Sequence, residues 1–109
     1  MTDQTPEELL TVHVSGDHCP CESLLNTGAF PDGWVDRYLD LLSSLAKKYA
    51  DRDMLPRQTV WDVHFASWYL PIRYNVWCSS TGNTNDETVG QLGRLRTPTE
   101  LFLAEGLER

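Results

Sequence analysis

The chain has 109 residues, 40% of them hydrophobic, and a formal net charge of −7. This size and apolar content allow a single domain over residues 1–109 with a core of its own, so neither disulfides nor a metal are needed as staples. No apolar run approaches the roughly 18 residues of a membrane span, and the acidic N-terminus is unlike a signal peptide. We therefore expect a cytoplasmic protein without membrane contact, with residues 1–8 flexible.

The negative charge is concentrated at the N-terminal end of the chain. Residues 1–32 contain six acidic residues and no Lys or Arg, whereas the rest of the chain has ten acidic and nine basic residues. An acidic segment without cations repels phosphate backbones and anionic lipid. Nucleic acid and membrane surfaces are therefore not expected as partners, whereas metal cations and protein partners remain open.

The first predicted element is a strand at residues 9–14. From Leu10 onward apolar and polar residues alternate, and several are β-branched, which is typical of a half-buried strand. The preceding residues Thr5-Pro6-Glu7-Glu8 have the pattern of a helix start, with Thr as the N-cap and Pro in the first turn. We predict a short helical turn that leads into the strand.

The second predicted element is a helix at residues 33–50, with Asp32 as its N-cap. Its apolar residues recur at three- and four-residue spacings along one face. They are Trp34, Tyr38, Leu41, Leu42, Leu45 and Tyr49. This periodicity is the clearest in the chain and predicts one side of the core.

The region between Pro56 and Ser79 is rich in aromatic residues and has two interpretations. Apolar and polar residues alternate on both sides of a 66–71 connection, which predicts strands at 59–65 and 72–78. A helix from Val60 to Leu70 is the alternative, because the aromatic residues also follow helical spacing.

The C-terminal region is predicted to contain a helix at 86–95, capped by Asn85, although two glycines weaken it. The following residues 97–100, Thr-Pro-Thr-Glu, have a capping-box pattern. Residues 100–104 are therefore either a closing strand or part of a short helix. With the strand, the elements follow the order βαββαβ, so the predicted fold is a single α+β domain with ferredoxin-like order, and a mostly α fold is the alternative.

The pentapeptide HCPCE at positions 18–22 is the clearest candidate for a metal site. Thiolate and imidazole are good ligands for zinc and copper, so His18, Cys19 and Cys21 are the candidate ligands. The sequence contains no second Cys-x-x-Cys or His-rich arm to complete a closed zinc site. An acidic loop with ordinary polar side chains is the simpler interpretation, and thiol redox chemistry is a third.

The aromatic stretch is the candidate for a partner-binding surface. Interfaces favour Trp and Tyr, and four Trp are many for a domain of this size. The candidate partner-binding residues are Trp61, Trp68, Tyr69 and Trp77. Packing in the core is the alternative, because large aromatic residues dominate core burial. Single-stranded nucleic acid is not expected here, since only Arg73 among residues 61–77 is basic.

A catalytic site is the weakest of the three candidates. On a strand, Asp62 and His64 would share a face and could form an acid–base pair, but no nucleophile motif accompanies them. The leading hypothesis is therefore a non-catalytic binding or accessory protein that self-associates, as a homo-oligomer, or docks on a protein partner. A zinc- or copper-binding protein comes second, and a small enzyme that uses His64 third.

Overall fold

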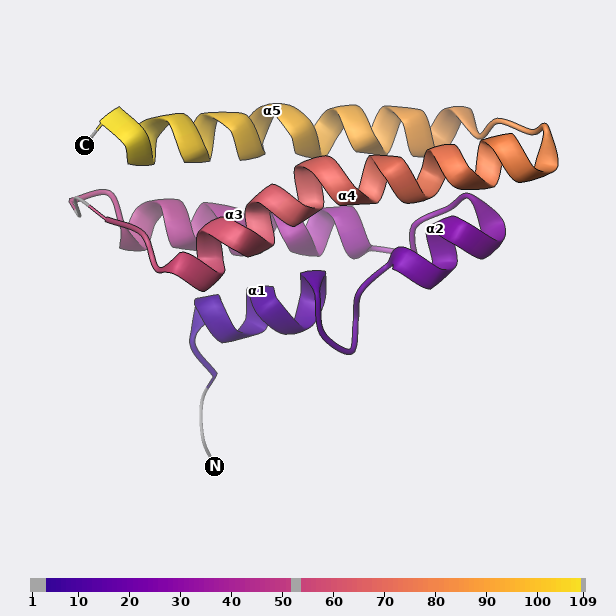
Figure 1. The fold of residues 1–109 in the computed structure, drawn as a ribbon. Helices are drawn as coiled ribbons and strands as arrows, with labels where there is room; N and C mark the ends of the chain where they lie inside the picture. The colour runs from indigo at the N-terminus through magenta and orange to yellow at the C-terminus, as the bar shows by residue number, and fades with distance from the viewer. Residues whose placement is uncertain (1–3, 52–53, 109) are drawn as a thin grey trace.

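The computed structural model describes residues 4–51 and 54–108, and within them the protein is entirely helical. These residues form five helices joined by loops, and no strand occurs among them. They are α1 (Pro6–Val14), α2 (Cys21–Thr27), α3 (Trp34–Lys48), α4 (Arg57–Thr81) and α5 (Asp86–Glu108). The predicted α+β fold of ferredoxin-like order is wrong, and the mostly α alternative describes the structure (Figure 1).

Four of the helices form a ring around one core. Helix α4 packs against α1 on one side and α5 on the other, and α3 closes the ring by packing against both α1 and α5. The short helix α2 packs on α4. This arrangement leaves one long side of α4 without a neighbouring helix.

Helix α3 confirms the predicted helix at 33–50. All but one of its predicted stripe residues are buried, and Tyr49 is half-buried just past the helix end. The N-cap differs from the prediction, since Gly33 occupies that position in place of Asp32 and no side chain caps the helix. Because its apolar residues lie on one side only, α3 packs that side against the core and exposes the other side to solvent.

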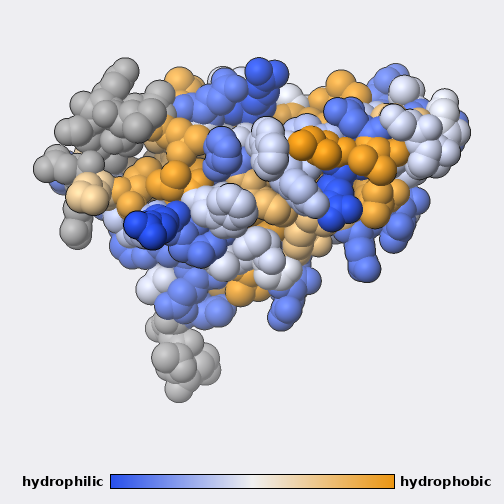
Figure 2. Space-filling model, viewed as in Figure 1, coloured by the Kyte–Doolittle hydropathy of each residue, from blue (hydrophilic) through white to orange (hydrophobic). Residues whose placement is uncertain are grey.

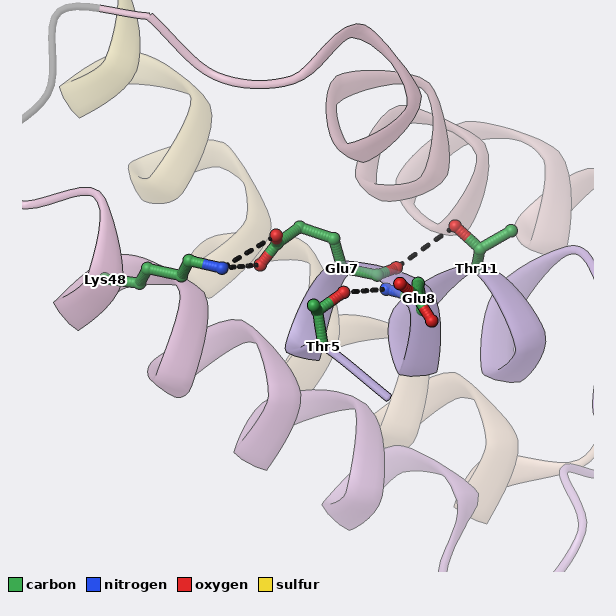
Figure 3. A network of polar contacts seen from close by, with 5 residues as sticks. All are labelled: Thr5, Glu7, Glu8, Thr11 and Lys48. Atoms are coloured by element: carbon green, nitrogen blue, oxygen red, sulfur yellow. Dashed lines mark hydrogen bonds and ion pairs between the residues drawn. The ribbon is translucent and has the colours of Figure 1, made fainter. Parts of the chain in front are cut away.

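Helix α1 replaces the predicted strand at 9–14. The Thr5 hydroxyl accepts a hydrogen bond from the backbone N–H of Glu8 at 3.2 Å, as a capping residue does (Figure 3). Glu7 also forms an ion pair of 2.8 Å with Lys48 at the end of α3, which ties the two helices together. The start signal at Thr5 therefore initiates a full helix. Residues 1–3 of the segment expected to be flexible lie outside the described residues.

Helix α4 replaces both predicted strands, at 59–65 and 72–78, and runs through Pro71 without interruption. Its buried residues follow helical spacing along the inner side. They are Thr59, Asp62, Val63, Ala66, Leu70 and Tyr74. Apolar residues also occupy the outer side of the helix. As a result, apolar and polar residues alternate in the sequence although the chain is helical.

Helix α5 begins as predicted and continues beyond the predicted end. The Asn85 side chain accepts a hydrogen bond from the backbone N–H of Thr88 at 3.2 Å, which confirms Asn85 as the cap. The Thr-Pro-Thr-Glu sequence at 97–100 lies inside the helix and starts no new one, and the predicted strand at 100–104 is helical. Thr99 is buried and shares a hydrogen bond of 2.5 Å with the Tyr38 hydroxyl, which ties α5 to α3.

Candidate functional site

The side of α4 that no other helix covers carries a continuous row of large apolar residues. At about 100° per residue, these residues fall within roughly a third of the helix circumference. We call them the outer face of α4: Trp61, Phe65, Trp68, Tyr69, Ile72 and Val76. Trp61 is 53% exposed, Trp68 is 58% exposed and Val76 is 46% exposed. Figure 2 shows orange and pale atoms over much of the side on which α4 lies.

Ring contacts connect the aromatic residues of the outer face to one another. Phe65 lies between Trp61 and Tyr69, with ring centroids 6.3 Å and 4.7 Å away, respectively. Trp68 lies 6.2 Å from Tyr69 and 6.3 Å from the His64 ring. Rings in mutual contact hold their side chains in fewer rotamers, so less conformational entropy is lost when a partner covers them.

The outer face carries almost no charge. Between residues 58 and 81 only Asp62 and Arg73 are charged at neutral pH. Asp62 is fully buried on the other side of the helix, and the Arg73 guanidinium lies over the Tyr69 ring, 4.9 Å from its centroid. No carboxylate of this stretch of α4 therefore lies on the outer face.

Three of the four residues predicted to bind a partner lie on the outer face, namely Trp61, Trp68 and Tyr69. Trp77 lies elsewhere, because sixteen residues of helix place it about 160° around the axis from Trp61. Its ring packs against the backbone of Gly28, where an added Cβ would lie 2.3 Å from a ring carbon. Trp77 is therefore part of the α2–α4 packing.

Sequence reasoning missed three residues of the outer face: Phe65, Ile72 and Val76. Starting from Trp61, successive spacings of four, three, four and four residues lead to Phe65, Trp68, Ile72 and Val76. The helical alternative for residues 60–70 includes Phe65, whereas Ile72 and Val76 lie beyond it. The spacing identifies a surface only once the region is known to be a helix.

The candidate metal ligands lie at the start of α2 and in the loop before it. The Cys19 and Cys21 sulfur atoms are 2.7 Å apart, both cysteines are half-buried, and His18 is exposed. In the part of the chain that the structure describes, no group of three or more His, Cys, Asp or Glu side chains is arranged to hold a metal ion. A zinc or copper site at these residues stays a prediction.

A cavity of about 440 Å³ opens beside this loop. The residues that line it include His13, Asp17, His18, Cys19, Trp34 and Arg37. The His13 ring stacks on Trp34 at 4.5 Å. Burial lowers the pKa of His13 from its ordinary value, and the positive charge of Arg37 acts in the same direction. The cavity thus combines ionisable side chains with an accessible thiol.

The candidate acid–base pair does not form. Asp62 and His64 are two residues apart, which on a helix directs them to different sides. The Asp62 carboxylate is buried and accepts hydrogen bonds from Thr11 at 2.6 Å, Gln58 at 3.0 Å and Ser15 at 3.1 Å. His64 is exposed beside Trp68 on the outer side of α4. Asp62 therefore joins α1 to α4, and His64 lies at the edge of the outer face.

No family model matches the chain, and no curated protein or solved structure matches it. Among the described residues, none of the helices has the length and apolar character needed to cross a membrane.

Proposed function

We propose that this protein is a non-catalytic binding protein that pairs with a second copy of itself through the outer face of α4. The observation that carries the proposal is the alignment of exposed Trp61 and Trp68 with Ile72 and Val76 along one side of a 25-residue helix. Trp is enriched at the centres of interfaces, where a few buried aromatic residues supply most of the binding energy.

The spacing of the outer face suits a second helix. Trp61, Phe65, Trp68 and Ile72 follow one another at intervals of four, three and four residues, which is the a/d spacing of helices that pack side by side. The same helix in a second copy carries the same row of residues. A two-fold axis would therefore bring two complementary rows together.

The charge of the protein favours this surface over others for self-pairing. Two copies with a formal charge of −7 each repel one another wherever their acidic groups meet. The charged side chains that α4 places beside the outer face are both basic: Arg57, four residues before Trp61, and Arg73, whose guanidinium lies on Tyr69. A neutral apolar surface on a strongly acidic protein is where like molecules can approach most closely.

Sedimentation and light scattering over a range of concentrations test the proposal. We expect a dimer for the wild type and a monomer for the double variant Trp61→Ser/Trp68→Ser. The dissociation constant of the single variant Trp68→Ser should rise at least about tenfold, which corresponds to about 1.4 kcal/mol.

The matched control is Leu101→Ser, which removes a residue that is 59% exposed on α5, away from the outer face. This variant should remain a dimer, and circular dichroism should show unchanged helix content in all variants. A wild type that stays monomeric at high concentration contradicts self-pairing. So does a dimer that Leu101→Ser disrupts and the double Trp variant leaves intact.

A further inference from the structure

The two cysteines of the HCPCE loop are in direct contact. Their sulfur atoms lie 2.7 Å apart, and both are free thiols, as is the third cysteine, Cys78 on α4. Only Pro20 separates the pair in the sequence, and Cys21 is the first residue of α2. The loop and the start of the helix therefore hold two thiols in a position to react with each other.

The separation of the sulfur atoms favours a bond between them over a shared metal ion. Two thiolates on one tetrahedral zinc, with Zn–S bonds of about 2.3 Å, lie nearly 4 Å apart. The sulfur atoms of a disulfide lie about 2.05 Å apart. To hold a metal, the two sulfur atoms would have to move apart by about 1.1 Å, whereas to form a disulfide they would have to move closer by about 0.65 Å.

The two thiols differ in accessibility. Cys19 lines the cavity of about 440 Å³, so a small molecule can reach its sulfur. Cys21 packs against the hydrophobic core. Burial raises the pKa of the Cys21 thiol to about 12, and contact with Cys19 adds to this shift, whereas the nearby Arg73 opposes it. A reaction with an external reagent therefore begins at Cys19.

We propose that Cys19 and Cys21 are a reversible dithiol–disulfide site whose substrate is a low-molecular-weight disulfide, RSSR. The Cys19 thiolate attacks one sulfur of RSSR, which forms a Cys19–SR mixed disulfide and releases RS⁻. The Cys21 thiolate then attacks Sγ of Cys19, which forms the Cys19–Cys21 bond and releases the second RS⁻. The protons of the two protein thiols end on the released thiolates. The protein dithiol is oxidised, and RSSR is reduced to two RSH.

Formation of the mixed disulfide at Cys19 favours the subsequent attack by Cys21. Once Cys19 carries the SR group, it is no longer a thiol partner of Cys21, and its contribution to the raised pKa of Cys21 is lost. Arg73 remains close to Cys21 and favours the thiolate, and its Nε–H is buried without a hydrogen-bond partner of its own. The small ring closed by Cys19-Pro20-Cys21 also strains the product, and strained disulfides are readily reduced again.

Glutathione disulfide is the probe for the experiment, and the fully reduced full-length protein is the starting material. Intact mass and peptide mapping after acid quenching report the products. The wild type should lose two hydrogen atoms and carry no lasting adduct, with the new bond between Cys19 and Cys21. Cys78→Ser should behave in the same way, and dithiothreitol should reverse the reaction in both.

Two further variants separate the steps. Cys21→Ser should accumulate one glutathione on Cys19, because the second thiol is missing. Cys19→Ser should react at position 21 at least about tenfold more slowly, because that thiol is half-buried against the core and burial raises its pKa. The proposal is overturned if the wild type retains three free thiols, keeps a glutathione adduct, or pairs either cysteine with Cys78. Since the oligomeric state is measured separately, this result is independent of the pairing through α4.

Discussion

Trp34 and His13 are joined by a reciprocal pair of hydrogen bonds and a ring contact. The Trp34 indole N–H donates to the backbone carbonyl of His13 at 3.0 Å, and His13 Nε2 donates to the backbone carbonyl of Trp34 at 2.8 Å. The two rings stack at 4.5 Å. The indole N–H also donates to the carbonyl of His18 at 3.1 Å, so one side chain at the start of α3 holds the end of α1 and the loop that carries the thiols.

Replacing Trp34 by Phe should destabilise the protein by about 2–3 kcal/mol. The substitution leaves two backbone carbonyls without their indole donor and removes part of a buried ring. Urea denaturation followed by circular dichroism measures the loss. Trp61→Phe is the matched control, because Trp61 is 53% exposed and its indole makes no hydrogen bond among those described. An equal effect of the two substitutions would contradict this role for Trp34.

His13 should make stability depend on pH below its ordinary pKa of about 6.5. Burial lowers the pKa of His13 in the folded protein, so the unfolded chain binds the proton more readily. The free energy of unfolding is therefore highest above about pH 6.5 and falls as the pH decreases toward the folded pKa. The limiting slope for one proton is about 1.4 kcal/mol per pH unit.

The test is urea denaturation at a series of pH values between about 7.5 and 5.5, a range above the ordinary titration of carboxylates. His13→Gln keeps a donor near the Trp34 carbonyl but has no group that titrates, so its stability should change less over this range. Equal slopes for wild type and His13→Gln would show that His13 is not responsible.

Asp62 should be one of the most sensitive polar positions in the protein. Asp62→Ala leaves the Thr11, Ser15 and Gln58 donors without their buried acceptor, and we expect a loss of about 3 kcal/mol. Asp62→Asn keeps the shape and should cost about 1–2 kcal/mol, since its amide N–H groups face other donors. Asp36→Asn is the control, at a side chain that is 71% exposed, and should change stability by less than about 0.5 kcal/mol. Comparable losses at the two positions would contradict a structural role for the buried carboxylate.

The sequence predicts α3 and the start of α5 well because each has a local signal that the fold does not override. In α3 the apolar residues lie on one side only, so the helical period is visible without tertiary information. At Asn85 a single side chain determines the start of the helix, and the same hydrogen bond forms in the structure. Signals of this kind depend on neighbouring residues alone.

Helix α4 could not be recognised in the same way, because both of its sides are apolar. Val63 and Tyr74 face the core, whereas Trp61, Ile72 and Val76 face solvent. Apolar residues therefore occur at alternate positions and mimic the pattern of a strand. Pro71 added to the error, since a proline within a helix removes one backbone hydrogen bond. The packing of α4 against α1, α2 and α5 supports the helix despite that loss.

The helical phase of α4 also explains why the candidate site was predicted only in part. Without that phase, Trp77 and Trp68 look equivalent in the sequence. On the helix they point to different sides, and only Trp68 is on the outer face. The contact between Cys19 and Cys21 required no such information, because both thiols belong to the same short segment.

The position of Trp77 leads to a prediction at Gly28, the residue that ends α2. Gly28 has φ of 67°, which a residue with a Cβ adopts only with strain, and its Cβ position is already filled by the Trp77 ring. Gly28→Ala should cost about 3 kcal/mol, of which about 1 kcal/mol comes from the left-handed backbone and the rest from displacing the ring. Gly82→Ala is the matched control, because Gly82 has φ of 72° and nothing lies within 4 Å of its Cβ position. It should cost only about 1 kcal/mol.

A double-mutant cycle separates the two contributions at Gly28. In a Trp77→Ala background the ring is absent, so adding Gly28→Ala should cost no more than Gly82→Ala does in the wild type. Urea denaturation of the four proteins gives the coupling energy, which we expect to be about 2 kcal/mol. If Gly28→Ala costs the same with and without the Trp77 ring, the ring does not pack against Gly28.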